Sequence, residues 1–354
     1  MPRTGLRSRV TTAIAGAVAL LAVTAGCSSS PSADAGATGS EPTTTLTVYT
    51  DQHAALVKGL TDAYTKKTGV TFDVQQDATV GQIQAEGKAS PADLFLSEDP
   101  APVAQLGKAG LLEPIASSTV AQVQPGLSSP QDLWVAYAAR VRVLFYNPGL
   151  IEKADLPKTL LDITDPQYKG KFAYAPSGAF VATTQYLIST IGTEKTTDFL
   201  KKVKANGVNE QKNGNVRDTV EAGKHAMGLS NHYYWWIKAA EVGGPEHMTS
   251  KIYHFPEADP GNLILSSGAA ILKTSTHKEA AAKFVQWLTS KDGGQQILSS
   301  ADIDESGAQY PVAVGTSSKL VGSLSDIASP TYDMSIYADQ SQAQQLLKSL
   351  GMTS

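Results

Sequence analysis

Two adjacent tyrosines are the residues of this sequence whose types and spacing best suit a chemical role. Tyr233 and Tyr234 lie in the stretch Ser230-Asn231-His232-Tyr233-Tyr234-Trp235-Trp236. Neighbouring side chains of a strand point to opposite faces, whereas at a helix start they lie roughly 100° apart, so both hydroxyls can converge there. Because a phenol titrates near pKa ~10, only a hard, highly charged cation would displace both protons at neutral pH, and ferric iron is the leading biological candidate. The alternative is a buried aromatic helix start whose hydroxyls are hydrogen-bonded.

Two further polar side chains follow strands of a predicted α/β sheet. The strand-like run Leu46–Thr50 leads through His53 into an amphipathic helix. Gly69 ends this helix and a second strand follows, which predicts a βαβ unit with a parallel sheet. Glu98 follows another apolar strand, Ala92–Leu96, with only Ser97 between them. Loops at the carboxyl ends of such strands line the ligand crevice of open α/β sheets, so we expect His53 and Glu98 to lie there.

Two other positions near strand ends have local explanations. Asp99 precedes Pro100, so it is expected to cap a helix that begins at the proline. The turn Pro176–Ala179 leads from a strand into a helix from about Phe180 to Ile191. Its free N–H groups and the positive helix end would suit an anion, although most such turns are only turns.

The rest of the chain also alternates short strands with amphipathic helices. Strands are expected at Trp134–Tyr137, Arg142–Tyr146 and Ala226–Leu229, the last leading to the tyrosine pair, and helices at Thr193–Gly207, Val216–Gly223, Lys278–Thr289 and Ser341–Leu350. Arg140 or Arg142 would either balance a bound anion or form a salt bridge on the face of a strand.

The N-terminus has the pattern of an exported lipoprotein. Three arginines precede an apolar run, and small residues then lead directly to Cys27, the only cysteine. This order is typical of a signal peptide, and Cys27 after Ala-Gly resembles a lipidation site; an ordinary secreted protein with a stray thiol is the alternative. The small polar residues up to Thr44 predict a flexible tether. The apolar run is shorter than the roughly 20 residues that a spanning helix needs.

Charge and motifs exclude two classes of function. Without the three arginines of the signal peptide, 33 acidic residues face 26 basic ones, so the mature chain is acidic and has no basic run with which to bind nucleic acid. The sequence has neither a G-x-S-x-G nor an H-E-x-x-H motif. We therefore expect a binding protein and not an enzyme.

Taken together, six segments of the chain resemble the ferric-iron-binding solute-binding lipoproteins of bacterial ABC importers. These segments are LTVYTDQH, SPADLFLSED, PSGAF, NHYYWW, DPGNLILSSGAAILK and a C-terminal helix. The resemblance implies that Fe(III) is bound by a nitrogen, a carboxylate and two phenolates, which here match His53, Glu98, Tyr233 and Tyr234. Oxygen donors suit such a hard cation. His232 is expected to be structural.

The resemblance also implies that a small synergistic anion, phosphate or carbonate, completes the coordination of the metal. The residues that match its binding site are Ser177, Gly178, Ala179, Asn213 and Asn231. Asp99 stands where the family often has Gln. We expect it mainly to cap its helix, with a partial repulsion of phosphate.

The implied architecture is the two-lobed α/β fold of type II periplasmic binding proteins, with hinge crossovers and a ligand cleft between the lobes. Crossings are expected near Ala138–Arg140 and near Asn262–Ile264. The expected parts are a signal peptide (1–26), a tether (27–44), lobe 1 (45–138 and 264–315), lobe 2 (139–263) and a C-terminal helical segment that packs on lobe 2 (316–354).

The implied function is capture of ferric iron and its delivery to an ABC permease and its ATPase. The protein would be a monomer on the outer face of the cytoplasmic membrane, held only by its lipid anchor. The alternative is the same fold with an organic solute such as a phosphonate, a polyamine or thiamine. The tyrosine pair together with His53 and Glu98 favours iron.

Overall fold

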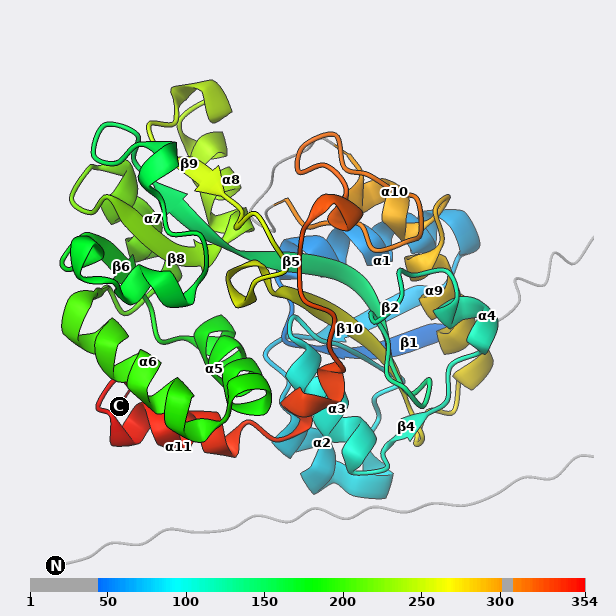
Figure 1. Ribbon diagram of the computed structural model, residues 1–354. Helices are drawn as coiled ribbons and strands as arrows, with labels where there is room; N and C mark the ends of the chain where they lie inside the picture. The colour runs from blue at the N-terminus through cyan, green and yellow to red at the C-terminus, as the bar shows by residue number, and fades with distance from the viewer. Residues whose placement is uncertain (1–43, 301–307, 354) are drawn as a thin grey trace, which may run out of the picture. The chain divides into compact units, whose positions relative to one another are not determined.

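The computed structural model describes residues 44–300 and 308–353, which belong to one unit of the chain (Figure 1). The predicted signal peptide, the predicted lipidation residue Cys27 and all of the predicted tether except Thr44 lie outside the described residues. In the described part, no helix combines the length and the apolar composition needed to cross a membrane.

The described strands form one mixed sheet in the order β2-β1-β3-β10-β5-β8-β6-β7, with β4 paired to β10 and β9 paired to β5. Their bounds are β1 Thr45–Thr50, β2 Thr71–Gln75, β3 Leu94–Leu96, β4 Leu112–Glu113, β5 Val135–Tyr146, β6 Phe172–Tyr174, β7 Val208–Asn209, β8 Met227–Asn231, β9 Lys251–Tyr253 and β10 Ile264–Leu272. Both β10 and β5 are antiparallel to their sheet neighbours, whereas β1 and β6 run parallel to theirs.

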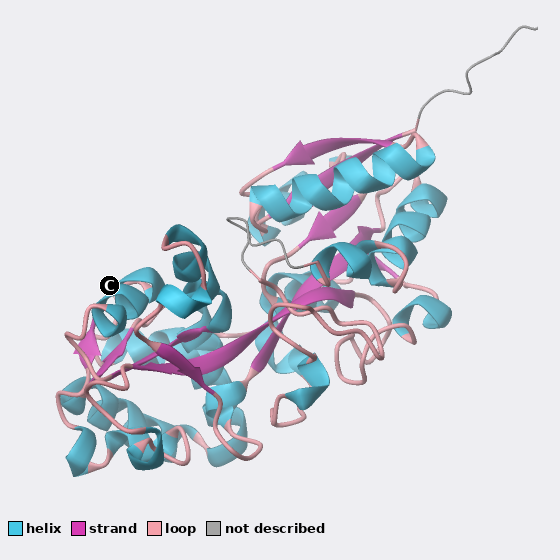
Figure 2. Cartoon of the chain, turned by 90° about the horizontal axis from the view of Figure 1, so that it is seen from above, coloured by secondary structure: helices cyan, strands magenta, loops and turns pink. Residues whose placement is uncertain are grey.

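Helices lie on both sides of the strands (Figure 2). Their bounds are α1 Ala54–Thr68, α2 Val80–Glu86, α3 Pro100–Lys108, α4 Ser117–Val120, α5 Gly178–Ile191, α6 Thr193–Asn206, α7 Asn213–Glu221, α8 His232–Glu241, α9 Lys278–Thr289, α10 Gly294–Leu298 and α11 Ser341–Ser349. The predicted βαβ opening is confirmed, because β1 and β2 are parallel and α1 connects them. Gly69 ends α1 in the left-handed conformation, with φ of 80°, which glycine adopts without strain.

The long strand β5 differs from the prediction. Two separate runs were expected, but Val135–Tyr146 is one strand of twelve residues, all of them buried. The stretch between the two runs pairs with β10, where Ala138 lies opposite Ser267 and Arg140 opposite Leu265. Tertiary pairing therefore keeps this stretch extended although alanine is a poor strand former.

A change of partners along β5 marks the transition between the two parts of the sheet. Residues up to Val141 pair with β10, and residues from Arg142 onward pair with β8 and β9. This point lies just beyond the expected crossing at Ala138–Arg140. The return strand β10 begins at Ile264, within the second expected range.

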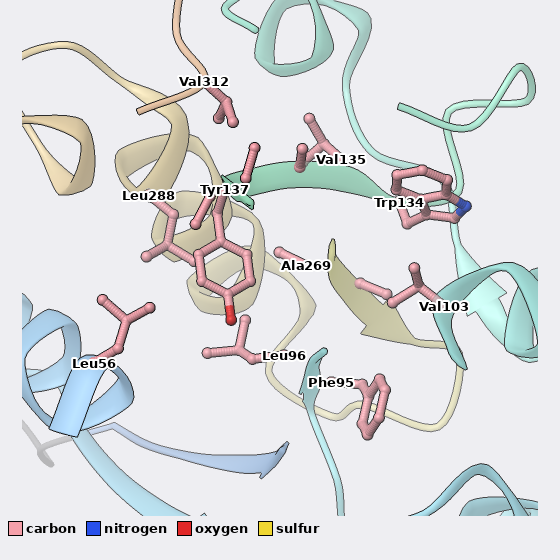
Figure 3. Packing of buried hydrophobic residues seen from close by; sticks show 14 of the residues in the cluster. Leu56, Phe95, Leu96, Val103, Trp134, Val135, Tyr137, Ala269, Leu288 and Val312 are labelled. Atoms are coloured by element: carbon pink, nitrogen blue, oxygen red, sulfur yellow. The ribbon is translucent and has the colours of Figure 1, made fainter. Parts of the chain in front are cut away.

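The larger hydrophobic core lies around β1, β3, β10 and the first half of β5. In it, Ala270 of β10 pairs with Phe95 of β3, and α9 packs on β10. Figure 3 shows the side chains of this core, among them Tyr137 of β5 close to Leu96 of β3. A strand and a helix from the second half of the sequence therefore complete the packing of the first three strands.

A second core forms between the sheet and helices α5 and α6, with Phe172, Leu200 and Leu229 among its members. The C-terminal helix α11 packs on α5 (Figure 1). The short 3-10 helix Met334–Ala338 packs against α3 as well as α5. The C-terminal segment therefore contacts α5 as well as α3.

Candidate metal site

The tyrosine pair lies in the first turn of α8, as predicted. Strand β8 ends at Asn231, whose extended backbone is followed directly by the helix from His232. The two tyrosine rings are stacked, with centroids 4.3 Å apart and planes 28° apart. Tyr233 is buried and Tyr234 is half-buried. The helix start therefore brings the two phenols side by side.

His53 and Glu98 approach this pair from the ends of two neighbouring strands. His53 directly precedes α1, and Glu98 follows β3, which is paired in parallel with β1. His53 Nε2 lies 3.7 Å from Glu98 Oε1, and the His53 ring meets the Tyr233 ring edge to face at 5.9 Å. The four predicted ligands therefore form one connected cluster.

The raised pKa of Tyr233 means that only a strong Lewis acid could bind this side chain as a phenolate. His53 Nε2 is shielded from solvent and has no hydrogen-bond partner among the described residues. Burial first, and then Tyr234 and the Glu98 carboxylate, raise the pKa of Tyr233 well above its ordinary value. At neutral pH Tyr233 is consequently a phenol, and a cation that binds it must displace its proton.

Arg140 is the buried cation beside this cluster. Its Nη1 donates a hydrogen bond to the Glu98 carbonyl oxygen and lies 3.5 Å from Glu98 Oε1, and its Nη2 donates to Asp99 Oδ1. Only 3% of the Arg140 side chain is exposed. Burial alone would lower the pKa of Arg140, but Asp99 and Glu98 raise it above the ordinary range. Arg140 is therefore charged, and its positive charge offsets the negative charges of Glu98 and Asp99.

The prediction that Asp99 caps its helix is wrong. Asp99 occupies the N-cap position of α3, yet its side chain makes no capping hydrogen bond. The carboxylate instead turns to the Arg140 guanidinium. Its Oδ2 lies 3.7 Å from the place where a Cβ on Gly178 would stand. A charge-assisted hydrogen bond to a buried guanidinium is stronger than a capping hydrogen bond to a backbone N–H. The Asp99 side chain therefore binds Arg140 and does not cap α3.

Two residues of the loop between β1 and α1 hold the predicted ligands in place and were missed by the sequence analysis. Asp51 Oδ1 accepts a hydrogen bond from the Glu98 N–H at 2.8 Å. Burial raises the pKa of Asp51 to about 6, and the nearby Asp99 and Glu98 carboxylates act in the same direction. Gln52 Oε1 accepts the His53 N–H at 2.9 Å. Only their place in the sequence could have indicated this role, since both residues directly precede His53 after β1.

The residues predicted to bind an anion are only partly together. Gly178 and Ala179 are the first residues of α5, and among the described residues neither N–H has an acceptor. Asn213, the first residue of α7, donates from Nδ2 to Ser177 Oγ at 2.9 Å. Asn231 is engaged elsewhere, because its Oδ1 accepts from Arg142 Nη1 at 2.8 Å.

His232 has the structural role that was expected. Its Nδ1 accepts the Val141 N–H at 3.1 Å, and its Nε2 lies 2.5 Å from the Ala308 carbonyl oxygen. Burial lowers the pKa of His232 to about 3. Both ring nitrogens of this neutral imidazole are therefore used within the protein. Of the other histidines, His225 pairs with Glu210 and His277 with Asp93, away from the tyrosines.

A family model of bacterial extracellular solute-binding proteins matches residues 48–295 of the chain. The chain belongs to this family. This solute-binding protein is similar to the Fe(3+)-binding periplasmic protein of Serratia marcescens, with 37% identity over 294 residues that cover 81% of this chain and 85% of the relative.

Two solved structures are similar to this solute-binding protein over most of its length. Iron-bound HitA from Pseudomonas aeruginosa has 34% identity and a TM-score of 0.78, covering 87% of this chain and 99% of that one. The Trichodesmium protein IdiA (FutA), in complex with iron and citrate, has 26% identity and a TM-score of 0.74, covering 87% and 100%. The predicted two-lobed α/β fold of periplasmic binding proteins is confirmed.

Proposed function

We propose that this solute-binding protein captures ferric iron through His53, Glu98, Tyr233 and Tyr234. The observation that supports it most is the cluster itself, in which an imidazole, a carboxylate and a phenol from three separate elements lie within a few ångströms, with the second phenol stacked on the first. Three of these donors are oxygens, the ligand type that a hard cation prefers. The iron-binding relatives from Serratia and Pseudomonas support the same assignment.

The iron is cargo in this proposal, and no reaction is catalysed. Glu98 and the two phenolates would supply three negative charges, which match the charge of Fe(III), and His53 would add a neutral donor. An additional anion would fill the remaining positions near the first turn of α5, where Ser177, Gly178, Ala179 and Asn213 lie, with Asn231 at the start of α8. Its source is either the solution or the chain.

The wider assignment is import. A lobe of residues 45–138 and 264–315 and a second lobe of residues 139–263 would hold the iron between them and present it to an ABC permease with its ATPase. Lipidation at Cys27 would keep the protein, as a monomer, on the outer face of the cytoplasmic membrane. The signal-peptide and tether patterns of the sequence support this location.

Visible absorption during iron loading tests the metal assignment. A phenolate bound to ferric iron gives a charge-transfer colour, which aliphatic carboxylates do not. We expect the mature protein to become coloured when ferric nitrilotriacetate is added, and Tyr233→Phe or Tyr234→Phe to lose most of the colour. Tyr168→Phe is the matched control, because Tyr168 is a buried phenol that donates to the Asp155 carbonyl oxygen in the second core. Unchanged colour in both site variants would refute the proposal.

A further inference from the structure

We propose that Asp99 is a built-in anion of the iron site, so that iron binds without phosphate or carbonate from solution. This inference rests on the proposed function and concerns only the source of the additional negative charge. Asp99 is a site residue whose contacts differ from expectation. The Asp99 carboxylate, which was expected to cap its own helix, lies instead between Arg140 and the start of α5.

The position of the carboxylate is the position in which an anion would be bound. One oxygen, Oδ1, accepts from Arg140 Nη2, and the other, Oδ2, lies beside Gly178, at 3.7 Å from where a Cβ on that glycine would stand. Gly178 and Ala179 open a helix of 14 residues, and their N–H groups have no acceptor in the described part of the chain. A guanidinium and a positive helix end are the two features that attract anions in proteins. Here the guanidinium donates to the Asp99 carboxylate of the chain itself, and the other oxygen of that carboxylate lies beside the first residue of the helix.

A charge count favours the same conclusion. Glu98 and two phenolates neutralise Fe(III), while His53 is a neutral donor. The remaining charges nearby are the buried cations Arg140 and Arg142, since the Asn231 amide oxygen that accepts from Arg142 is neutral. Besides Asp99, the Asp51 carboxylate lies in the same cluster, where it accepts from the Glu98 N–H and offsets the charge of Arg142. Asp99 balances Arg140. With Asp99 present, the loaded site is neutral without any ion from solution, and a phosphate would add negative charge beside an existing carboxylate.

Without the Asp99 charge, iron binding would require an anion from solution. Arg140 Nε is already buried without a hydrogen-bond partner among the described residues. In Asp99→Asn, Nη2 loses its anionic acceptor as well, so the guanidinium would offer its unneutralised charge and free donors to an ion from solution. Phosphate or bicarbonate would then enter beside Gly178. The position next to Arg140 would be filled in both proteins, by the chain in one and by the solution in the other.

Iron titrations with and without added anion test the inference. Wild type, Asp99→Asn and Asp99→Glu are titrated with ferric iron in competition with EDTA, at constant ionic strength in buffer free of phosphate and carbonate, and phosphate or bicarbonate is then added in steps. We expect the iron affinity of wild type and Asp99→Glu to change by less than about threefold. The affinity of Asp99→Asn should fall without anion and recover by at least about tenfold as the anion saturates its site.

Two controls make the result decisive. Asp62→Asn removes an exposed carboxylate that pairs with Lys58, so it reports any general effect of a lost charge. Circular dichroism and thermal melting of each variant show whether it is folded. An equal gain of iron affinity from phosphate in wild type and Asp99→Asn would overturn the inference, as would a folded Asp99→Asn that neither anion restores. If wild type binds no iron, the proposed function itself fails.

Discussion

Iron binding should release one proton from each tyrosine that becomes a phenolate ligand. A phenol of ordinary pKa near ~10 is ionised in about one molecule in a thousand at pH 7, and its ionisation costs about 4 kcal/mol there. Burial raises the pKa of Tyr233 further, so its phenol costs more to ionise. The metal must supply this free energy, because it binds only the deprotonated form.

Higher pH lowers the cost of ionisation, so iron affinity should rise with pH. Each displaced proton contributes a factor of about ten per pH unit, and two phenols give up to about a hundredfold. Since the pKa of Tyr233 is raised and not lowered, its proton is still present throughout the neutral range, and the dependence should not level off there.

Proton release in weakly buffered solution measures this effect. Wild type, Tyr233→Phe and Tyr234→Phe are loaded from the same ferric chelate, and the base needed to hold the pH is divided by the iron bound. Protons exchanged by the chelator are common to all three proteins and cancel in the difference. Each variant should release about one proton less per iron than wild type. Equal release per bound iron in all three would show that the phenols do not bind as phenolates.

Three further outcomes are expected. His53→Ala should keep most of the ferric colour that Tyr233→Phe loses, because water can replace a neutral donor; a colourless His53→Ala would contradict this. Cys27→Ser should leave iron binding intact but move the protein from the membrane to the soluble fraction, and retention in the membrane would exclude lipidation at this residue. The pKa of His232 is lowered to about 3, so the unfolded chain takes up this proton at higher pH than the folded protein does. Its stabilisation is complete above pH ~6.5 and falls by about 1.4 kcal/mol per unit below it. Urea unfolding at pH 7 and pH 4.5 should show a loss about 2.7 kcal/mol larger for wild type than for His232→Gln, and equal losses would refute it.

The grouping of the proposed metal ligands could be predicted because it follows from local rules. His53 and Glu98 each follow a strand, and β1 and β3 are neighbours that run in parallel, so residues after them meet at one edge of the sheet. The tyrosine pair follows β8 at a helix start, where adjacent side chains can lie side by side. Strand ends and helix starts are readable in sequence, and these rules were sufficient for this part of the site.

The role of Asp99 could not be predicted, because its partner is distant in sequence. An Asp before a proline is a good cap by every local criterion. Arg140, which decides otherwise, lies 41 residues further along the chain and is buried only after β5 joins the sheet. The support of Glu98 by Asp51 depends in the same way on the pairing of β1 with β3. The local capping preference of Asp99 is outweighed because a buried charge from another element binds its carboxylate.

The unbroken strand β5 connects the two halves of the proposed metal site through one piece of backbone. Arg140 and Arg142 point to the same face of this strand, about 7 Å apart. The first contacts Glu98 and Asp99 and the second contacts Asn231, which directly precedes the tyrosine helix. Residues close to β5 move little when this strand twists, whereas loops far from it move by larger distances. A twist of β5 would therefore shift the Glu98 carboxylate and the two phenols only slightly relative to each other. Capture and release of a cation would then require only a slight change in ligand spacing.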